Sequence, residues 1–341
     1  MRSSITPTLI FSQSAERIKM GFILGQIENA YKKVLLSRHD RDDRVFYFSD
    51  EDFPGLIKRE YPFENSDGYL LKGTFYYYDN PRTDRIIIFD HGLAPGHRSY
   101  MREIETICRS GFVVFTFDHT GSGDSEGEHV RGLCGSLCDL DDCLFVLKGI
   151  EELRDKKFIV VGHSRGGYSA LNILAFHPEV SRIVAMSGFV SVEVMHNQLA
   201  PAILVPVRKL IYELERKYNP EYVNCSAFNA LSVSDAPALI IHSADDKTVS
   251  ARANFGRLKK TFATRPNTYF HLVKDRDHNP TFTKEAVEYK HAFFKDLAKI
   301  KKQGTAMSEE ECAKFVSSYD WYKMTEQDET VWKVIIDFIG K

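Results

Sequence analysis

Short apolar runs alternate with longer segments of mixed polarity over most of the chain. The apolar runs occupy positions 86–89, 112–117, 158–161, 183–186, 239–241 and, more weakly, 268–273. Runs of this length without polar interruptions are typical of strands that are buried on both faces of a parallel sheet. The intervening segments predict helices near 98–109, 135–153, 166–176, 250–261 and 329–339. The pattern therefore predicts an α/β fold, with a doubly wound, mostly parallel sheet.

The first part of the chain departs from this alternation. Apolar residues recur at helical spacing over 15–36, which predicts an amphipathic helix within an N-terminal extension of residues 1–45. Two strands are expected next, at 57–63 and 69–78, joined by the turn residues Ser66, Asp67 and Gly68. We expect these strands to be antiparallel and to begin the main domain, which spans 46–341.

Two longer segments interrupt the main domain. The first, about 191–234, contains a helix-like stretch at 207–218, and the second, about 280–328, contains helix-like stretches at 284–302 and 308–319. Extra helices at these points would lie over the carboxyl ends of the strands. We expect the first segment to form a cap that shapes a binding pocket, with additional packing as the alternative, whereas for the second segment both interpretations stay open.

Composition and charge exclude several classes of protein. The chain has 341 residues, a formal net charge of -2 and 43% hydrophobic residues, which gives no electrostatic reason to expect a nucleic-acid partner. Six cysteines occur without a C-x-x-C pair, so we expect no metal and a reducing cytoplasm. We find no signal peptide and no apolar stretch of ~18 residues, so no membrane span is expected. The oligomeric state cannot be predicted.

Chemistry is indicated first by Ser164, within Gly162-His163-Ser164-Arg165-Gly166. An apolar run precedes this motif and a predicted helix follows it. A serine at such a strand-to-helix turn projects from the sheet edge, and small residues at 162 and 166 give the turn room. The first backbone N–H groups of the helix point at the same place, so the Arg165 N–H is a candidate oxyanion donor.

A nucleophilic serine needs a base and an acid that orients the base. His278 follows the predicted strand at 268–273, and Asp246 follows the strand at 239–241. The order Ser164, Asp246, His278 is the one that accompanies a nucleophile of this type. Asp245 competes with Asp246 for the role of acid. We expect the neighbouring His163 to point away from the serine.

Two loop residues complete the sequence interpretation. The loop after the strand at 86–89 contains Gly92, which permits close backbone approach, and the Leu93 N–H is the second candidate oxyanion donor. His119, after the strand at 112–117, could line the rim of the pocket, but we expect it to lie in a solvated loop.

From about Leu56 to Ile339 the chain resembles the α/β-hydrolase superfamily. The resemblance is carried by His91-Gly92, the loop Asp118-x-x-Gly121-x-Gly123-x-Ser125-x-Gly127, the Ser164 motif, Asp246 three residues before Val249, and His278. The loop resembles the branch of bacterial carboxylesterases, cinnamoyl-type esterases and serine aminopeptidase-like proteins. Two departures are Ser243, where the family has glycine, and Asp277, where glycine often precedes the histidine. A negative charge at Asp277 could raise the basicity of His278.

The resemblance implies a serine hydrolase that acts on esters, thioesters or amides without metal or organic cofactor. We expect cleavage of a carboxylic ester of a small, partly apolar substrate through an acyl-enzyme. An aminopeptidase-like enzyme acting on short peptides, or another amide or thioester hydrolase, is the first alternative. Candidate acidic anchors for a peptide amine are Glu126, Glu193 and Glu213. A non-catalytic ligand-binding or sensor protein on the same fold is the second alternative.

Overall fold

A mixed sheet forms the centre of the molecule. The structure is a computed structural model that describes residues 21–22, 24–199, 205–304 and 307–341. Within these ranges eight strands form one sheet in the order β1-β4-β6-β5-β7-β8-β9-β10. In that order their bounds are Ile57–Glu60, Gly73–Tyr77, Phe112–Phe117, Arg82–Asp90, Lys157–His163, Arg182–Met186, Ala238–Ser243 and Thr268–Val273. The β1–β4 and β4–β6 pairs are antiparallel and the others are parallel, as the sequence pattern predicted.

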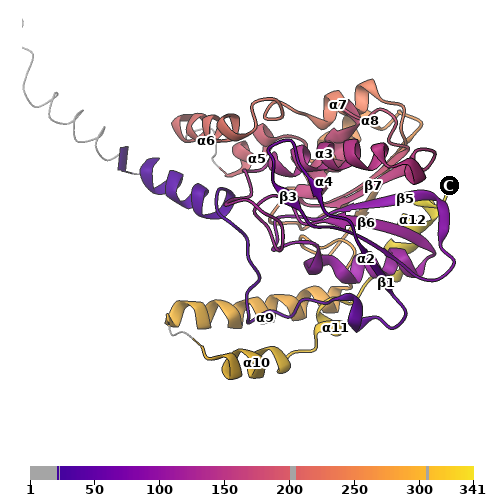
Figure 1. Cartoon of the computed structure of the whole chain (residues 1–341). Helices are drawn as coiled ribbons and strands as arrows, with labels where there is room; N and C mark the ends of the chain where they lie inside the picture. The colour runs from indigo at the N-terminus through magenta and orange to yellow at the C-terminus, as the bar shows by residue number, and fades with distance from the viewer. Residues whose placement is uncertain (1–20, 23, 200–204, 305–306) are drawn as a thin grey trace, which may run out of the picture.

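Helices cover both faces of the sheet (Figure 1). On one face, α2 (Met101–Arg109) and α12 (Glu329–Ile339) share one apolar core with the sheet. On the other face, α3 (Gly135–Gly149), α4 (Arg165–Asn172) and α8 (Phe255–Phe262) share a second core. This arrangement confirms the doubly wound α/β architecture, because the central strands β6, β5, β7, β8 and β9 bury apolar side chains on both of their sides.

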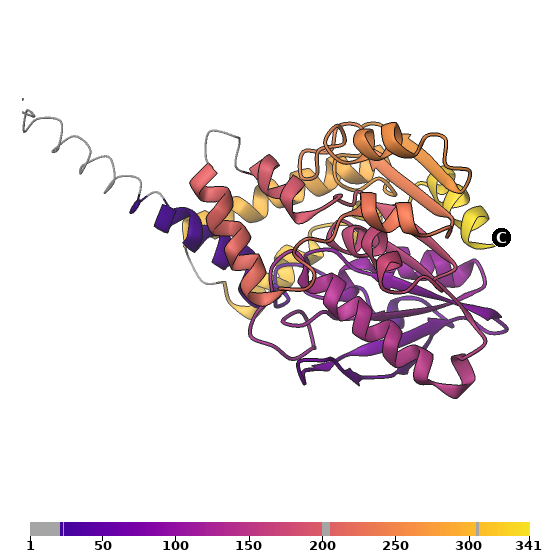
Figure 2. The same ribbon diagram turned by 90° about the horizontal axis from the view of Figure 1, so that it is seen from above.

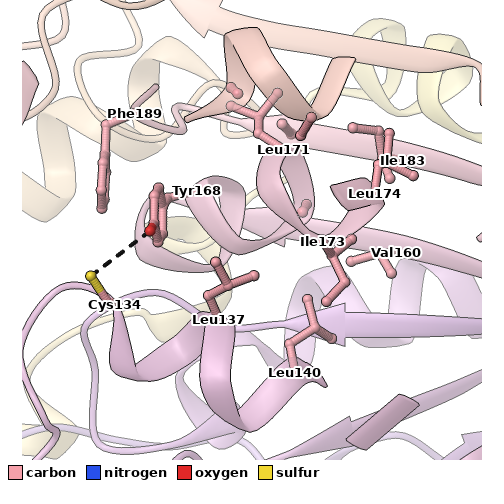
Figure 3. Packing of buried hydrophobic residues seen from close by; sticks show 14 of the residues in the cluster. Cys134, Leu137, Leu140, Val160, Tyr168, Leu171, Ile173, Leu174, Ile183 and Phe189 are labelled. Atoms are coloured by element: carbon pink, nitrogen blue, oxygen red, sulfur yellow. Dashed lines mark hydrogen bonds between the residues drawn. The ribbon is translucent and has the colours of Figure 1, made fainter. Parts of the chain in front are cut away.

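Helix α4 is held firmly against its neighbours. Tyr168 stacks on Phe189 with ring centroids 4.5 Å apart, and its hydroxyl lies 3.8 Å from the Cys134 sulfur at the start of α3 (Figure 3). Leu171 and Leu174 pack in the same core with less than 2% of their surface exposed. Because α4 follows Ser164 directly, this packing fixes the position of the residue that the sequence analysis singled out.

The first two predicted strands are each divided in the structure. Residues 57–63 give β1 and the short β2 (Phe63–Glu64), and residues 69–78 give the short β3 (Leu70–Leu71) and β4. Strands β2 and β3 pair with each other in a separate two-stranded sheet. Pro62 lies at the break and has no N–H to donate to a strand partner, so the ladder cannot continue through it.

The two long insertions are helical. The first contains α5 (Val192–Leu199), α6 (Val205–Tyr218) and α7 (Ala227–Val233). The second contains α9 (Lys284–Gln303), α10 (Glu309–Ser317) and α11 (Trp321–Met324). Figure 1 shows α5 and α6 on one side of the strand ends, and α9 and α10 on the other. Whether either insertion acts as a cap stays a prediction.

The predicted N-terminal helix is present at 24–35, and residues 1–20 lie outside the described part of the chain. It lies beside α6 in both views (Figure 2). Tyr31 donates a hydrogen bond to the buried carboxylate of Glu215 on α6, and that carboxylate also accepts the Leu133 N–H at 2.6 Å. One buried side chain thus joins this helix, α6 and the loop before α3. Within the described ranges, no helix combines the length and apolar character that a bilayer crossing requires.

Candidate active site

Ser164 lies at a sharp turn between β7 and α4. Its backbone has φ 57° and ψ −114°, a strained combination for a residue with a side chain. A Cβ atom at Gly162 would collide with the Gly166 carbonyl oxygen, and one at Gly166 would collide with the Asp90 carbonyl oxygen. The two glycines are therefore required by close backbone approach, and the serine is presented at the carboxyl edge of the sheet.

The structure brings Ser164, His278 and Asp246 together. The His278 Nε2 atom lies 2.8 Å from the Ser164 Oγ atom, and its Nδ1 atom lies 2.9 Å from an Asp246 carboxylate oxygen. Since the carboxylate can only accept, the neutral ring donates from Nδ1 and accepts the serine hydroxyl proton at Nε2. The arrangement is that of a nucleophile, a base and an orienting acid.

Asp246 rather than Asp245 contacts His278. The Asp246 carboxylate is buried and also accepts the Thr248 and Val249 N–H groups, both at 2.8 Å, while His242 Nε2 lies 3.2 Å away. Burial acts to raise the pKa of this carboxyl, but the hydrogen bonds from His242 and His278 outweigh it and hold the pKa well below its usual range. Asp246 is thus an ionised acceptor at neutral pH.

The exposed Asp245 instead accepts the Ser243 hydroxyl and the Asp277 N–H, which fastens the loop that carries His278. The Asp277 carboxylate accepts the Lys247 N–H at 3.1 Å and lies 2.9 Å from His291 Nε2. With its two oxygens turned to these partners, Asp277 supports the loop that carries His278.

The loop after β5 passes close to Ser164. A Cβ atom at Gly92 would lie 3.1 Å from the Ser164 Cβ atom and 2.5 Å from the Tyr100 hydroxyl oxygen, so only glycine fits. Leu93 follows directly, and its N–H finds no backbone acceptor among the described residues. The Arg165 N–H is the first of α4 and has no acceptor within the helix. Both predicted oxyanion donors thus belong to segments that meet at Ser164.

His163 is the residue that the sequence interpretation underrated. Its Nε2 atom lies 2.7 Å from the His278 carbonyl oxygen and its Nδ1 atom 3.0 Å from the Tyr100 hydroxyl, so both ring nitrogens have partners other than the Ser164 hydroxyl. Its ring centroid is 4.9 Å from that of His278. The only sequence signal for these contacts was that His163 is adjacent to Ser164.

The prediction for His119 is wrong. Its side chain is completely buried, with Nε2 2.6 Å from an Asp90 oxygen and Nδ1 3.3 Å from an Asp139 oxygen. Burial lowers its pKa, but the two carboxylates outweigh burial and raise the pKa to about 9. Despite this grouping, no three or more His, Cys, Asp or Glu side chains within the described ranges are arranged to hold a metal ion.

Two family descriptions match the chain. One, for the α/β-hydrolase fold, matches residues 85–206, and the other, for putative esterases, matches residues 146–296. Together with the sheet order, these matches confirm the expected resemblance to the α/β-hydrolase superfamily. The chain has the α/β-hydrolase fold, and the class of protein that these matches support is a hydrolase.

Individual relatives are distant. The chain is 25% identical over 213 residues to the uncharacterised protein YfhR of Escherichia coli, covering 60% of this chain and 69% of that protein. It is 31% identical over 140 residues to the human mitochondrial palmitoyl-protein thioesterase ABHD10, covering 38% of this chain and 44% of that protein.

Two solved esterases show the same fold. The Pyrococcus furiosus esterase Pf2001 superposes with a TM-score of 0.55 at 19% identity, covering 83% of this chain and 98% of its own. An acetyl xylan esterase from Paenibacillus superposes with a TM-score of 0.51 at 15% identity, covering 76% and 88%. At these identities the likeness concerns the fold alone.

Proposed function

We propose that this chain is a serine hydrolase that cleaves a carboxylic ester of a small, partly apolar substrate through an acyl-enzyme. The observation that carries the proposal is the position of the His278 ring, 2.8 Å from the Ser164 hydroxyl and 2.9 Å from the Asp246 carboxylate. These are the distances that proton transfer from a nucleophile to an oriented base requires.

In the proposed reaction, Ser164 Oγ attacks the acyl carbonyl carbon while its proton moves to His278 Nε2. Asp246 holds the ring in the tautomer with Nδ1 protonated and stabilises the positive ring that forms. The ring then gives its proton to the leaving alkoxide, and the C–O bond of the ester breaks. A water molecule, deprotonated by the same ring, releases the acid from Ser164 in the second half of the reaction.

The negative oxygen of the tetrahedral intermediate needs donors that are already in place. The Leu93 and Arg165 N–H groups are the proposed donors. The tight approach of Gly92 to Ser164, and the position of Arg165 at the start of α4, support this assignment. Preorganised donors of this type are typically worth ~10²–10³ in turnover.

An ester is favoured over a peptide because two of the three candidate amine anchors have other partners, and the third lines a hollow that does not include Ser164. Glu126 accepts the Leu70 N–H at 2.9 Å, and Glu213 pairs with Arg216 at 2.6 Å. Glu193 lines a hollow of about 400 Å³ between α5, α6 and the segment 223–226, and Ser164 is not among the residues that line it. In the part of the chain that the structure describes, none of these carboxylates forms a hydrogen bond with Ser164.

The substrate class is tested with matched panels of p-nitrophenyl esters, acyl thioesters and aminoacyl anilides. We expect turnover of short- and medium-chain esters by the native protein and none by Ser164→Ala. A thioester preference would place the chain nearer to the thioesterase activity for which its relative ABHD10 is named. Hydrolysis of anilides but not of esters would overturn the ester assignment in favour of a peptidase.

The rival from a different class is a sensor that binds a ligand without turning it over. A sensor does not need an oriented base within hydrogen-bond distance of a strained serine. The presence of this arrangement therefore disfavours the sensor. A native protein that binds esters, as measured by calorimetry, but neither hydrolyses them nor reacts with a fluorophosphonate would favour the sensor.

A further inference from the structure

We propose that Tyr100 and His163 are positioning residues, which link the loop of the oxyanion donor Leu93 to the main chain of the base His278. The proposal rests on the function proposed above. It adds a chain of hydrogen bonds from Tyr100 through His163 to the His278 carbonyl, called the relay below, to the triad of Ser164, His278 and Asp246. Tyr100 precedes α2, His163 ends β7 and His278 follows β10, so the relay joins segments that are far apart in the chain.

The hydrogen-bond directions in this relay are fixed by chemistry. The His278 carbonyl oxygen can only accept, so His163 must donate to it from Nε2 across the 2.7 Å contact. The other ring nitrogen, Nδ1, is then an acceptor in the neutral ring. It receives the Tyr100 hydroxyl proton across 3.0 Å.

The Tyr100 end of the relay contacts the loop that carries Gly92 and the proposed oxyanion donor Leu93. The hydroxyl oxygen occupies the position 2.5 Å from where a Gly92 Cβ atom would lie, so it rests directly against the Gly92 backbone. The Tyr100 ring also packs on Phe89 of β5, with centroids 5.6 Å apart. The peptide unit that carries the Leu93 N–H therefore has a rigid support on the side of α2.

The His278 end needs a support because its loop is strained. Asp275 and Asp277 have φ values of 58° and 44°, in the left-handed region that side chains disfavour. Asp245 and the Lys247 N–H hold this loop from the β9 side. His163 holds it from the β7 side, where the nucleophile lies, and so sets the distance between the base and Ser164.

His163 suits this role because it stays uncharged. Burial, together with the smaller effect of the neighbouring His278, lowers its pKa to about 3. A neutral ring 4.9 Å from His278 does not oppose the positive charge that His278 acquires when it takes the serine proton. A cationic side chain at the same position would oppose it.

The test compares two amide substitutions that each keep one half of the relay. In His163→Gln the amide nitrogen reaches the position of Nε2 and can still donate to the His278 carbonyl. In His163→Asn the amide reaches only the position of Nδ1 and keeps the contact with Tyr100 alone. Tyr100→Phe removes the hydroxyl, and Tyr78→Phe, which breaks the 3.0 Å bond to Glu105 away from Ser164, is the control.

We expect kcat for an ester to fall ~10–100-fold in His163→Asn and less than ~5-fold in His163→Gln, with KM nearly unchanged in both. Tyr100→Phe should lose ~3–10-fold in kcat and in the rate of fluorophosphonate labelling, and Tyr78→Phe should lose neither. Melting temperatures of all variants are measured alongside, so that a loss of folded protein is recognised.

If kcat falls equally in His163→Gln and His163→Asn, and the falls follow the decreases in melting temperature, the relay is overturned and His163 is a packing residue. Native activity in all three variants would overturn it as well. Failure of the proposed function looks different, because the native protein itself would then neither hydrolyse esters nor react with the fluorophosphonate.

Discussion

Two histidine–aspartate pairs lie at the carboxyl edge of the same sheet and differ in exposure and in the partner of the second ring nitrogen. His278, after β10, keeps 18% of its side chain exposed and turns Nε2 to the Ser164 hydroxyl. His119, after β6, is completely buried and turns Nε2 to Asp90, with Asp139 at its other nitrogen. The pair by itself is therefore no sign of a catalytic base. What matters is whether the second ring nitrogen is free to accept a proton from a nucleophile.

The charge of the two rings follows from these surroundings. With a pKa of about 9, His119 carries its proton at neutral pH and balances two buried carboxylates. We expect His119 to contribute to stability, whereas His278 is the proposed base. Substitutions at the two positions should therefore separate activity from stability.

The largest effect is expected for His278→Ala. Loss of the proposed base should lower kcat roughly 10⁶-fold, the scale known for removal of a catalytic histidine from such a triad. Because the ring is partly exposed, the melting temperature should change by only a few degrees. Steady-state ester hydrolysis and a thermal melt of the same sample measure both. A variant that retains a tenth of the native kcat would contradict the role of His278.

Asp246→Asn comes next. The amide should favour the wrong ring tautomer and lower kcat about 10⁴-fold while leaving the fold intact. Asp245→Asn is the matched control, since its carboxylate contacts the loop and not the ring. Kinetics on both variants decide between the neighbouring carboxylates. A greater loss in Asp245→Asn would reverse the assignment.

Gly92→Ala should have an intermediate effect. The added methyl group would meet the Tyr100 hydroxyl at 2.5 Å and displace the peptide that carries the Leu93 N–H. We expect kcat to fall ~10²–10³-fold, as for the loss of one oxyanion donor. Gly149→Ala, where nothing lies within 4 Å of the new Cβ atom, is the control for the substitution itself. Unchanged kcat in Gly92→Ala would remove this loop from the site.

His119→Gln should have the smallest effect on activity and a large one on stability. Removing one partner of a buried charged group costs about 3–5 kcal/mol, while kcat should change by less than ~10-fold. The pKa of His119 is raised on folding, from 6.5 to about 9, so its stabilising contribution is complete below pH ~6.5 and disappears as the pH rises through ~9.

Urea unfolding of the native protein and of His119→Gln at several pH values measures how the stabilising contribution of His119 depends on pH. The difference in unfolding free energy should be largest at pH 6 and should narrow towards pH 10. A difference that widens with increasing pH would mean that His119 is buried in its neutral form.

The sequence predicted the parts of the molecule that follow from periodicity and local chemistry. Unbroken apolar runs located the strands from β5 to β10, and the glycines around Ser164 indicated the turn. The structure also brought Ser164, Asp246 and His278 together as expected, because parallel strands place the residues that follow them at one edge.

The remaining features depend on contacts between distant segments. The hydrogen bonds of His163 with Tyr100 and with the His278 carbonyl join three segments that are far apart in the chain, and neither leaves a spacing pattern in the sequence. The burial of His119 was missed for the same reason, since Asp90 and Asp139 belong to other elements. The division of the first predicted strands depends on where their partners lie, although Pro62 was a visible signal.

Covalent labelling of the native protein by a fluorophosphonate, followed by mass spectrometry of its peptides, asks whether the serine at the strained turn is reactive. We expect one adduct, on the peptide containing Ser164, formed much more slowly in His278→Ala and absent in Ser164→Ala. An unlabelled native protein, or an adduct on any other residue that persists in Ser164→Ala, would contradict the assignment of Ser164 as the nucleophile.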